Sequence, residues 1–187
     1  METKHRCTWC EKDDLYRNYH DNEWGKPVYD DATIFEFLIL ETFQAGLSWY
    51  TVLAKRENFR KAFDQFDWNT IAKYSEEKMA ELAEDSGIIR NKLKIKATVT
   101  NAQAFLKVQE EFGSFSKYIW GFVEGKPIDN QPQTLKDVTA TTPISDALSK
   151  DLKKRGFKFV GTTVVYAHLQ ATGMVNDHLL SCWKRNA

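Results

Sequence analysis

The sequence predicts an all-α protein, on three observations. Apolar residues recur at helical spacing along most of the chain, serine and aspartate residues suited to helix N-caps precede several of these segments, and strand patterns are weak throughout. The chain has 187 residues, of which 42% are hydrophobic and 28% are charged, as in an ordinary globular protein. We therefore expect a single helical domain over residues 1–187, built around one core or two closely fused lobes.

The first fifty residues are rich in aromatic side chains and lack a regular apolar period. We expect them to form loops and short turns wrapped around another group. Within these fifty residues the first clear helix comes after Asp31, because residues 33–43 are apolar nearly all round, as in a central buried helix, and Asp30 and Asp31 are suited to its N-cap. Ser48 predicts the start of a second helix, whose apolar residues between Trp49 and Phe63 share one face.

Two shorter helices are expected next, at about 68–74 and at about 76–84, and Ser75 is suited to the N-cap of the second. A tight turn, Asp85-Ser86-Gly87, then leads into a long helix. In this long helix the apolar residues from Ile95 to Phe105 stay in helical register. The chain therefore contains a helix, a short hairpin and a second helix in succession.

The segment from Gly125 to Pro143 contains three prolines and many small polar residues. We expect a loop there, and it is the one candidate boundary between two lobes. Ser145 predicts the start of another helix that Gly156 ends, and a last helix extends to about Gly173.

Composition excludes several classes of protein. No stretch of 18 apolar residues occurs and the N-terminal segment is charged, so we expect a cytoplasmic protein that does not enter a membrane. Three cysteines are an odd number, which argues against a disulfide framework. The 26 basic and 26 acidic residues cancel, but basic residues concentrate in 88–96 and 150–158 and acidic residues in 64–85. Such segregation can mark a nucleic-acid face or simply a helical surface.

Histidines and cysteines at the two ends of the chain form a candidate metal site. His178 and Cys182 are four residues apart, which on a helix places both side chains on one face. The matching pair must come from the other end, as His20 with Cys7 or Cys10. Four nitrogen and sulfur ligands would make a closed structural zinc site, without an open position for water. The alternative is that these residues are ordinary buried thiols and surface imidazoles.

Glu41 is a candidate functional carboxylate because it lies in the most apolar helix of the chain. An unpaired buried carboxylate is costly and has its pKa raised, so acids are seldom placed there without a partner or a task. The alternative is a carboxylate without a functional role, whose hydrogen-bonding capacity is satisfied by a backbone amide or a tyrosine hydroxyl. The segment Gln44-Ala45-Gly46-Leu47-Ser48-Trp49 favours a functional role, because it combines an amide, a flexible glycine, an exposed leucine and a tryptophan that could stack on a base.

The hairpin after residue 84 is a candidate phosphate site. We expect the backbone amides of the turn and the N-terminus of the following helix to face outward, with Arg90, Lys92 and Lys94 adding positive charge. The pattern by itself is weak, since many helical hairpins contain a glycine and a lysine.

Taken together, these segments resemble the 3-methyladenine DNA glycosylase I family, within the helix-hairpin-helix superfamily of base-excision enzymes. The similarity covers residues 6–182 in order and without large gaps. It is carried by Arg6-Cys7-Thr8-Trp9, Tyr19-His20-Asp21-Asn22-Glu23-Trp24-Gly25, Leu40-Glu41, Gln44-Ala45-Gly46-Leu47-Ser48-Trp49, Gly87-Ile88-Ile89-Arg90, Lys153-Lys154-Arg155-Gly156-Phe157-Lys158-Phe159-Val160-Gly161 and Val175-Asn176-Asp177-His178.

The resemblance implies an activity and a set of roles. It implies a monomeric, monofunctional enzyme that hydrolyses the N-glycosidic bond of 3-methyladenine in alkylated double-stranded DNA and leaves an abasic site. It also implies that one structural zinc ion binds Cys7, His20, His178 and Cys182 rather than Cys10, and that Glu41 recognises the polar edge of the base and is the candidate catalytic residue. The implied base-binding residues are Trp9, Tyr16, Tyr19, Trp24 and Trp49, and the implied DNA-binding residues are Gln44, Gly46, Leu47, Gly87, Ile88, Arg90 and Lys92.

Two departures from the superfamily limit this transfer. The hairpin contains Gly87 alone, where many relatives have two glycines, and no aspartate follows it at the usual catalytic position; the family itself is similar in lacking that aspartate. Two other functions compete. A non-catalytic, zinc-stabilised binder of damaged or single-stranded nucleic acid would not need the buried Glu41, and a small-molecule zinc hydrolase would need an open coordination position.

Overall fold

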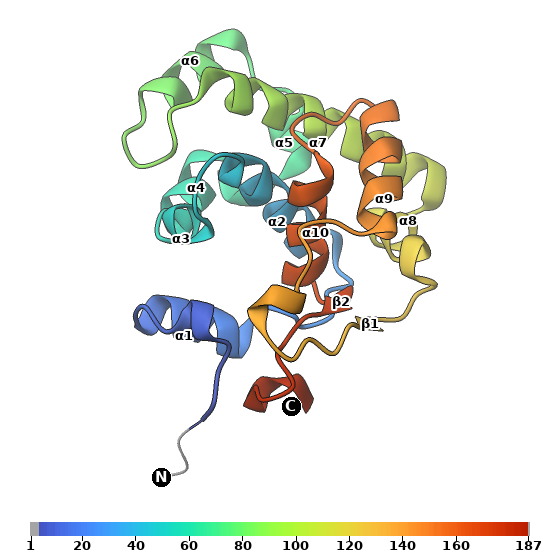
Figure 1. The fold of residues 1–187 in the computed structure, drawn as a ribbon. Helices are drawn as coiled ribbons and strands as arrows, with labels where there is room; N and C mark the ends of the chain where they lie inside the picture. The colour runs from blue at the N-terminus through green and yellow to red at the C-terminus, as the bar shows by residue number, and fades with distance from the viewer. Residues whose placement is uncertain (1–3, 187) are drawn as a thin grey trace.

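The structure is a computed structural model that describes residues 4–186, and it is mostly helical, as predicted. Helix α2 lies in the middle of the molecule, the α6–α7 pair at one end, and α1 with the C-terminal segment at the other (Figure 1). The helices and the two short strands are α1 (Asp14–Asn22), α2 (Asp31–Gln44), α3 (Trp49–Leu53), α4 (Arg56–Ala62), α5 (Trp68–Ile71), α6 (Glu76–Glu84), α7 (Lys92–Phe112), α8 (Phe115–Trp120), α9 (Pro143–Lys154), α10 (Thr162–Ala171), β1 (Ile128–Asp129) and β2 (Val175–Asn176).

Helix α2 is the central buried helix that the sequence predicts. The Asp30 carboxylate caps it by accepting a hydrogen bond from the Thr33 amide at 2.8 Å. From Ile34 to Phe43 its side chains are buried except for Glu36, and α3, α7, α8 and α10 all pack against it. Glu41 is therefore held by an element that is surrounded on several sides.

The serine caps are confirmed at two helices and displaced at a third. Ser48 caps α3 and Ser75 caps α6, each by accepting a backbone amide hydrogen bond at 3.2 Å. At α9 the N-cap is Thr142, and Ser145 completes a capping box from the third helical position. The expected helix from Trp49 to Phe63 is wrong in extent, because the chain bends after Leu53 and continues as α4. At this bend Lys55 donates hydrogen bonds to the backbone carbonyls of Ser86 and Gly87, which ties α4 to the hairpin.

The expectation that the aromatic N-terminal segment forms only loops is wrong. Asp13 caps α1 through the Tyr16 amide at 2.9 Å, and Tyr19 and His20 are buried on this helix. The aromatic residues Tyr16 and Tyr19 are three apart, so this short helix presents them on one face. Helix α8 was also unexpected; its buried residues Phe115, Tyr118 and Ile119 have the same spacing.

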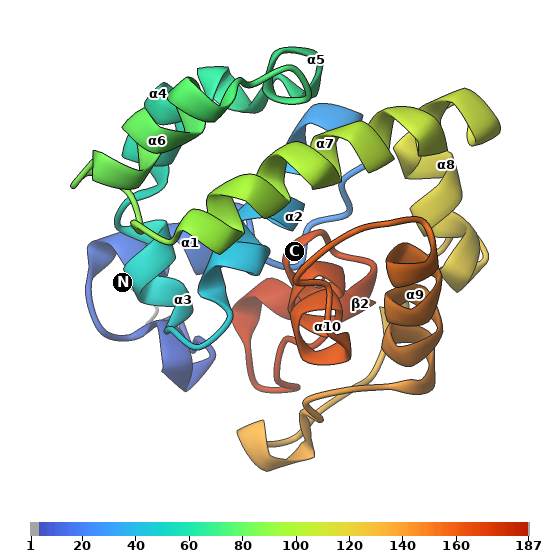
Figure 2. The ribbon, with the colours of Figure 1, turned by 90° about the horizontal axis from the view of Figure 1, so that it is seen from above.

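The loop at 125–143 does not separate two cores in the described part of the chain. Buried residues before and after it, such as Val123 and Leu148, belong to one hydrophobic cluster. Within the loop, β1 pairs in parallel with β2, with Ile128 opposite Val175, and this ties the loop to the C-terminal segment. Viewed from above, α7 crosses over the middle of the molecule with α6 beside its N-terminal end (Figure 2). Among residues 4–186 no helix combines the length and apolarity needed to cross a membrane.

Candidate functional site

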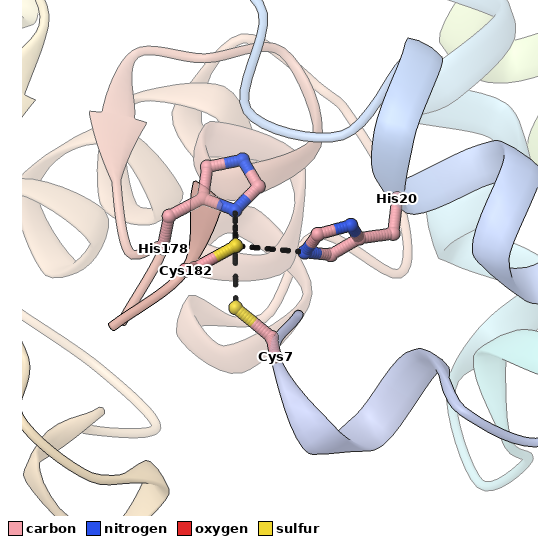
Figure 3. A group of neighbouring side chains, drawn as sticks. All are labelled: Cys7, His20, His178 and Cys182. Carbon is pink, nitrogen blue, oxygen red and sulfur yellow. Dashed lines mark hydrogen bonds between the residues drawn. The ribbon is translucent and has the colours of Figure 1, made fainter. Parts of the chain in front are cut away.

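Two cysteines and two histidines from opposite ends of the chain converge in a buried cluster. The candidate ligand atoms of Cys7, His20, His178 and Cys182 all lie within 4.8 Å of one another (Figure 3). The Cys182 Sγ is 3.5 Å from His20 Nε2 and 3.6 Å from His178 Nδ1, and the Cys7 Sγ is 3.8 Å from His178 Nδ1. The four residues form one compact set of nitrogen and sulfur atoms.

These distances fit a tetrahedral zinc site. With Zn–S bonds of about 2.3 Å and Zn–N bonds of about 2.0–2.1 Å, neighbouring sulfur and nitrogen ligands lie roughly 3.5 Å apart. The ring nitrogens that face away from the cluster have acceptors: His20 Nδ1 donates to the Asp21 carboxylate at 2.8 Å and His178 Nε2 donates to the Trp24 carbonyl at 3.2 Å. Both imidazoles are therefore oriented as metal ligands usually are, with a lone pair on the inner nitrogen.

The thiol that completes the cluster at the N-terminal end is Cys7 and not Cys10. Cys10 is buried, but its Sγ donates to the Cys7 carbonyl oxygen at 3.1 Å, away from the cluster. The hydrogen bond between the two thiols lowers the pKa of Cys182, which also bonds both imidazoles, and raises the pKa of Cys7. None of the three cysteines is in a disulfide.

One geometric expectation about this cluster is wrong. His178 and Cys182 were expected on one face of a helix, but the segment that carries them is irregular chain and a turn after β2. Their side chains converge because the chain turns back, with the Cys182 amide donating to the Leu179 carbonyl at 2.8 Å. The spacing of four residues correctly indicates that the two side chains meet, but a turn and not a helix brings them together.

Beside the cluster, aromatic side chains line a cavity of about 200 Å³. The ring of Trp9 lies edge-on to those of Tyr16, at a centroid distance of 4.9 Å, and Trp24, at 5.0 Å; Tyr19 and Trp49 are 5.4 Å apart. All five aromatic residues that the resemblance implies for base binding lie in its wall, together with Glu41 and Gln44.

The carboxyl group of Glu41 lies in this cavity almost without solvent contact. Glu41 is 2% exposed, and its Oε2 has no hydrogen-bond partner among the described residues. Burial raises the pKa of Glu41 from 4.5 to about 8. The alternative of a carboxylate satisfied by a backbone amide or a tyrosine hydroxyl does not hold for Oε2 among the described residues. Oε2 is buried and unpaired, and Glu41 lines the cavity, which makes this carboxyl group a candidate for contact with a ligand there.

The cavity and the cysteine–histidine cluster share a wall. The ring of Trp9 is 5.4 Å from that of His20, and the ring of Trp24 is 4.6 Å from that of His178. Two of the aromatic residues around the cavity therefore rest directly on the candidate metal ligands.

Sequence reasoning missed part of the wall. Leu135 and Val138 come from the loop at 125–143, which the sequence marked only as a lobe boundary, and Ala167, Gln170 and Asp177 come from α10 and the segment after β2. Asp177 is 3% exposed and accepts hydrogen bonds from Asn130, Tyr166 and Gln170. Only Asp177 carried a signal, since it adjoins His178 in the sequence.

The turn after α2 lies next to the cavity. A second hollow of about 180 Å³ shares Glu41 and Gln44 with it, and it extends along Gly46 and Leu47 to the beginning of α10. Gly46 adopts a positive φ of 82°, and the Leu47 side chain beside it is 44% exposed. The leucine is thus presented to solvent at the mouth of the site.

The hairpin between α6 and α7 differs from expectation in its backbone. The Gly87 amide donates to the Asp85 carboxylate at 2.7 Å and the Ile88 amide to the Asp85 carbonyl at 3.4 Å, so these two amides do not face outward unpaired. Ile88 itself is 3% exposed and belongs to the core. Arg90 and Lys92 are exposed, as expected.

Comparison with known proteins shows the family of the chain. The sequence model of the methyladenine glycosylase family matches residues 9–185. The chain is 50% identical over 177 residues to DNA-3-methyladenine glycosylase 1 of Escherichia coli strain K12, which covers 95% of each chain. The structure of 3-methyladenine DNA glycosylase I from Staphylococcus aureus is similar with a TM-score of 0.94 at 39% identity, over 96% of both chains. A variant of 3-methyladenine DNA glycosylase I in complex with 3-methyladenine has a TM-score of 0.94 at 38% identity, over 96% of this chain and 97% of the other. The chain therefore belongs to the methyladenine glycosylase family.

Proposed function

We propose that the chain is a monofunctional DNA glycosylase that hydrolyses the N-glycosidic bond of 3-methyladenine in alkylated double-stranded DNA and releases the free base. The observation that carries this proposal is the buried, unpaired Glu41 carboxyl group in an aromatic cavity. Membership of the methyladenine glycosylase family and the similarity to a structure with bound 3-methyladenine support it.

The pKa of Glu41 accounts for selection of a methylated base. Methylation at N3 gives adenine a positive charge, and a nearby cation favours the ionised form of a carboxyl group. In the free protein burial raises the pKa of Glu41 to about 8, so the group is mostly protonated at neutral pH. A cationic base would ionise it and form a charge-assisted contact, with added cation–π attraction from the aromatic walls. Neutral adenine offers no such compensation.

The reaction requires little acid catalysis, because the methylated base leaves as a neutral species. Glu41 recognises the polar edge of the base, and its negative charge also favours an oxocarbenium-like sugar in the transition state. The residues that line the described cavity include no lysine. The nearby buried Lys94 has its ammonium group bonded to two carbonyl oxygens. This arrangement favours attack by water over a lysine Schiff base.

We also propose that Cys7, His20, His178 and Cys182 hold one structural zinc ion. The ion supplies a cross-link between the chain ends, and the four protein ligands leave it no open position for substrate. The distances within the cluster and the orientation of both imidazoles support this assignment. The protein's own contribution is to keep Trp9 and Trp24 packed against the two histidines.

The protein would bind DNA as a monomer. The DNA would lie across the mouth of the cavity. Leu47 would fill the gap left by the extruded nucleotide, with Gln44 and Gly46 beside it. On the helix-hairpin-helix unit, Arg90 and Lys92 would contact phosphates, whereas Gly87 and Ile88 would act by shaping the turn.

The test is release of free base from methylated duplex DNA under single-turnover conditions, with wild type, Glu41→Gln and Glu110→Gln. Glu110 is exposed on α7 and serves as the matched control. We expect 3-methyladenine and an intact abasic strand from the wild type and the control, and strongly reduced release from Glu41→Gln. Binding of methylated DNA without release would instead identify a non-catalytic binder, and wild-type release by Glu41→Gln would refute the role of this carboxylate.

A further inference from the structure

Phe159 is an exposed aromatic residue held in an unusual backbone conformation. Its φ is 56°, in the left-handed region that non-glycine residues seldom adopt, and its side chain is 39% exposed. The neighbouring apolar residues point the other way: Phe157 is 2% exposed and Val160 is 1% exposed. The positive φ therefore turns a phenylalanine ring out to solvent between two core residues.

The surrounding structure imposes this conformation. Asn101 on α7 is fully buried, and its side chain grips the residue before Phe159 twice: Oδ1 accepts from the Lys158 amide at 2.7 Å, and Nδ2 donates to the Lys158 carbonyl at 3.1 Å. On the other side, the Val160 carbonyl accepts from the Ser149 hydroxyl at 2.6 Å. A strained residue that is fixed from both sides is typical of functional surfaces.

Phe159 lies close to the turn that follows α2. Its ring centroid is 6.0 Å from the Lys94 ammonium, which in turn donates to the Ala45 carbonyl at 2.6 Å, two residues before Leu47. Phe159 also precedes α10, whose first turn borders the hollow beside Leu47. It does not line the aromatic cavity that contains Glu41. The ring is thus near the wedge residue but outside the base pocket.

The surface around the ring is apolar and positively charged. A groove of about 350 Å³ beside it is lined by Leu93, Lys96, Ala97, Thr100, Lys158 and Phe159, with no acidic residue. Leu93 is 71% exposed. Lysines around an exposed aromatic ring suit a nucleic acid, which offers phosphates to the cations and flat base faces to the ring.

We propose that Phe159 is a second apolar residue of the DNA interface, and that it stacks on the base opposite the damaged nucleotide once that nucleotide is extruded. This inference rests on the proposed glycosylase function. Extrusion leaves the opposite base without a pairing partner and exposes part of its face in the gap. Leu47 occupies the damaged strand's side of the gap, and Phe159 supports the orphaned base from outside the pocket. Together the two side chains hold the extruded state open.

The decisive variant is Phe159→Gly, because glycine adopts a positive φ without strain and the substitution removes only the ring. We expect its thermal stability and its binding of free 3-methyladenine to match those of the wild type. Affinity for duplex DNA with an abasic analogue should fall, since one base–aromatic stack corresponds to about 5- to 150-fold in affinity. Single-turnover excision at subsaturating enzyme should fall in parallel, and Phe159→Tyr should restore both.

Two controls separate the ring from its setting. Glu124→Gly relieves a similar positive φ of 54° at an exposed residue that is not aromatic. Phe112→Ala removes a phenylalanine of similar exposure, 38%, at the C-terminal end of α7, whereas Phe159 lies near the N-terminal end of that helix. Neither should change DNA affinity. A 2-aminopurine placed opposite the abasic analogue should be quenched on binding wild type and Phe159→Tyr, and markedly less by Phe159→Gly.

The outcomes distinguish this inference from the proposed function. If the wild type excises 3-methyladenine and Phe159→Gly does so equally, with equal DNA affinity and equal quenching, the role of Phe159 is refuted and the function stands. Reduced affinity with unchanged quenching would also overturn stacking on the opposite base, leaving only a backbone contact. If the wild type releases no base, the proposed function fails first.

Discussion

The ammonium group of Lys94 lies 2.6 Å from the carbonyl oxygen of Ala45 and donates a hydrogen bond to it. A second hydrogen bond, at 2.8 Å, goes to the carbonyl of Phe43. Both carbonyls belong to the end of α2, whereas Lys94 is in the first turn of α7 and is only 5% exposed. A buried side chain of the hairpin unit therefore fixes the turn that presents Leu47.

The first prediction concerns this connection. Lys94→Met keeps the length of the side chain and removes both donors, which leaves two carbonyls unsatisfied. We expect the free energy of unfolding to fall by about 1–3 kcal/mol. Excision from duplex DNA should fall by roughly ten- to a hundredfold, because the wedge turn would lose its position.

Free 3-methyladenine should still bind to Lys94→Met with wild-type affinity, since Glu41 lies one turn earlier in α2. Tryptophan fluorescence measures this binding. The exposed Lys107 on the same helix provides a control, as Lys107→Met. A parallel loss of free-base binding would contradict a role limited to the turn.

The second prediction is a pH dependence of stability caused by Glu41. Burial raises its pKa from 4.5 to about 8, so the folded protein retains a proton that the unfolded chain releases above pH 4.5. Stability from this group is therefore fully present below about pH 4.5 and is lost as the pH rises towards 8. Glu41→Gln removes that loss. The unfolding free energy of the variant minus that of the wild type should therefore increase by roughly 3 kcal/mol between pH 5 and pH 8. Urea denaturation of both proteins across this range would show a constant difference if Glu41 were ionised in the folded state.

The third prediction concerns the metal. Cys182→Ala removes one of four ligands, and we expect its metal content, measured by mass spectrometry, to fall from about one zinc per chain to near zero. Its melting temperature and excision rate should fall as well, because Trp9 and Trp24 lose the support of the two histidines. Cys10→Ala is the matched control, since Cys10 is buried nearby but outside the cluster. Loss of zinc from the control and not from Cys182→Ala would reverse the assignment of ligands.

The fourth prediction uses a glycine that touches the cluster. Gly25 has a φ of 78°, and an added Cβ would lie 2.8 Å from His178 Nε2. Gly25→Ala should displace the His178 ring from its hydrogen bond to the Trp24 carbonyl and weaken zinc binding by about 10- to 100-fold. Gly125→Ala has a comparable φ of 73° with nothing within 4 Å, so it separates backbone strain from contact with the histidine. Competition with a zinc indicator measures the zinc affinity of both variants. If Gly25→Ala and Gly125→Ala bind zinc equally well, contact with the histidine is ruled out as the cause.

Periodicity and caps were sufficient for most of the helices because these signals are local. The apolar run around Glu41 and the cap Ser75 predicted α2 and α6 closely, whereas Ser48 predicted only the start of α3. The same signals missed α1, because its apolar face consists of a few aromatic residues on a short polar helix. They also predicted one continuous helix from Trp49 to Phe63, where the chain breaks at Lys55. The hydrogen bonds of Lys55 to the hairpin are long-range, and no local pattern encodes them.

For the site, the sequence by itself determined which side chains are candidates for chemistry: an acid in an apolar helix, the aromatic residues near it, and a cysteine–histidine pair at each end of the chain. Only the tertiary structure decided how they meet. It places Cys7 rather than Cys10 beside His178, supplies Leu135 and Val138 to the pocket wall, and pairs the hairpin amides with Asp85. These relations join segments distant in sequence or depend on the turn of a single side chain, so packing and hydrogen-bond geometry decide them and residue type does not.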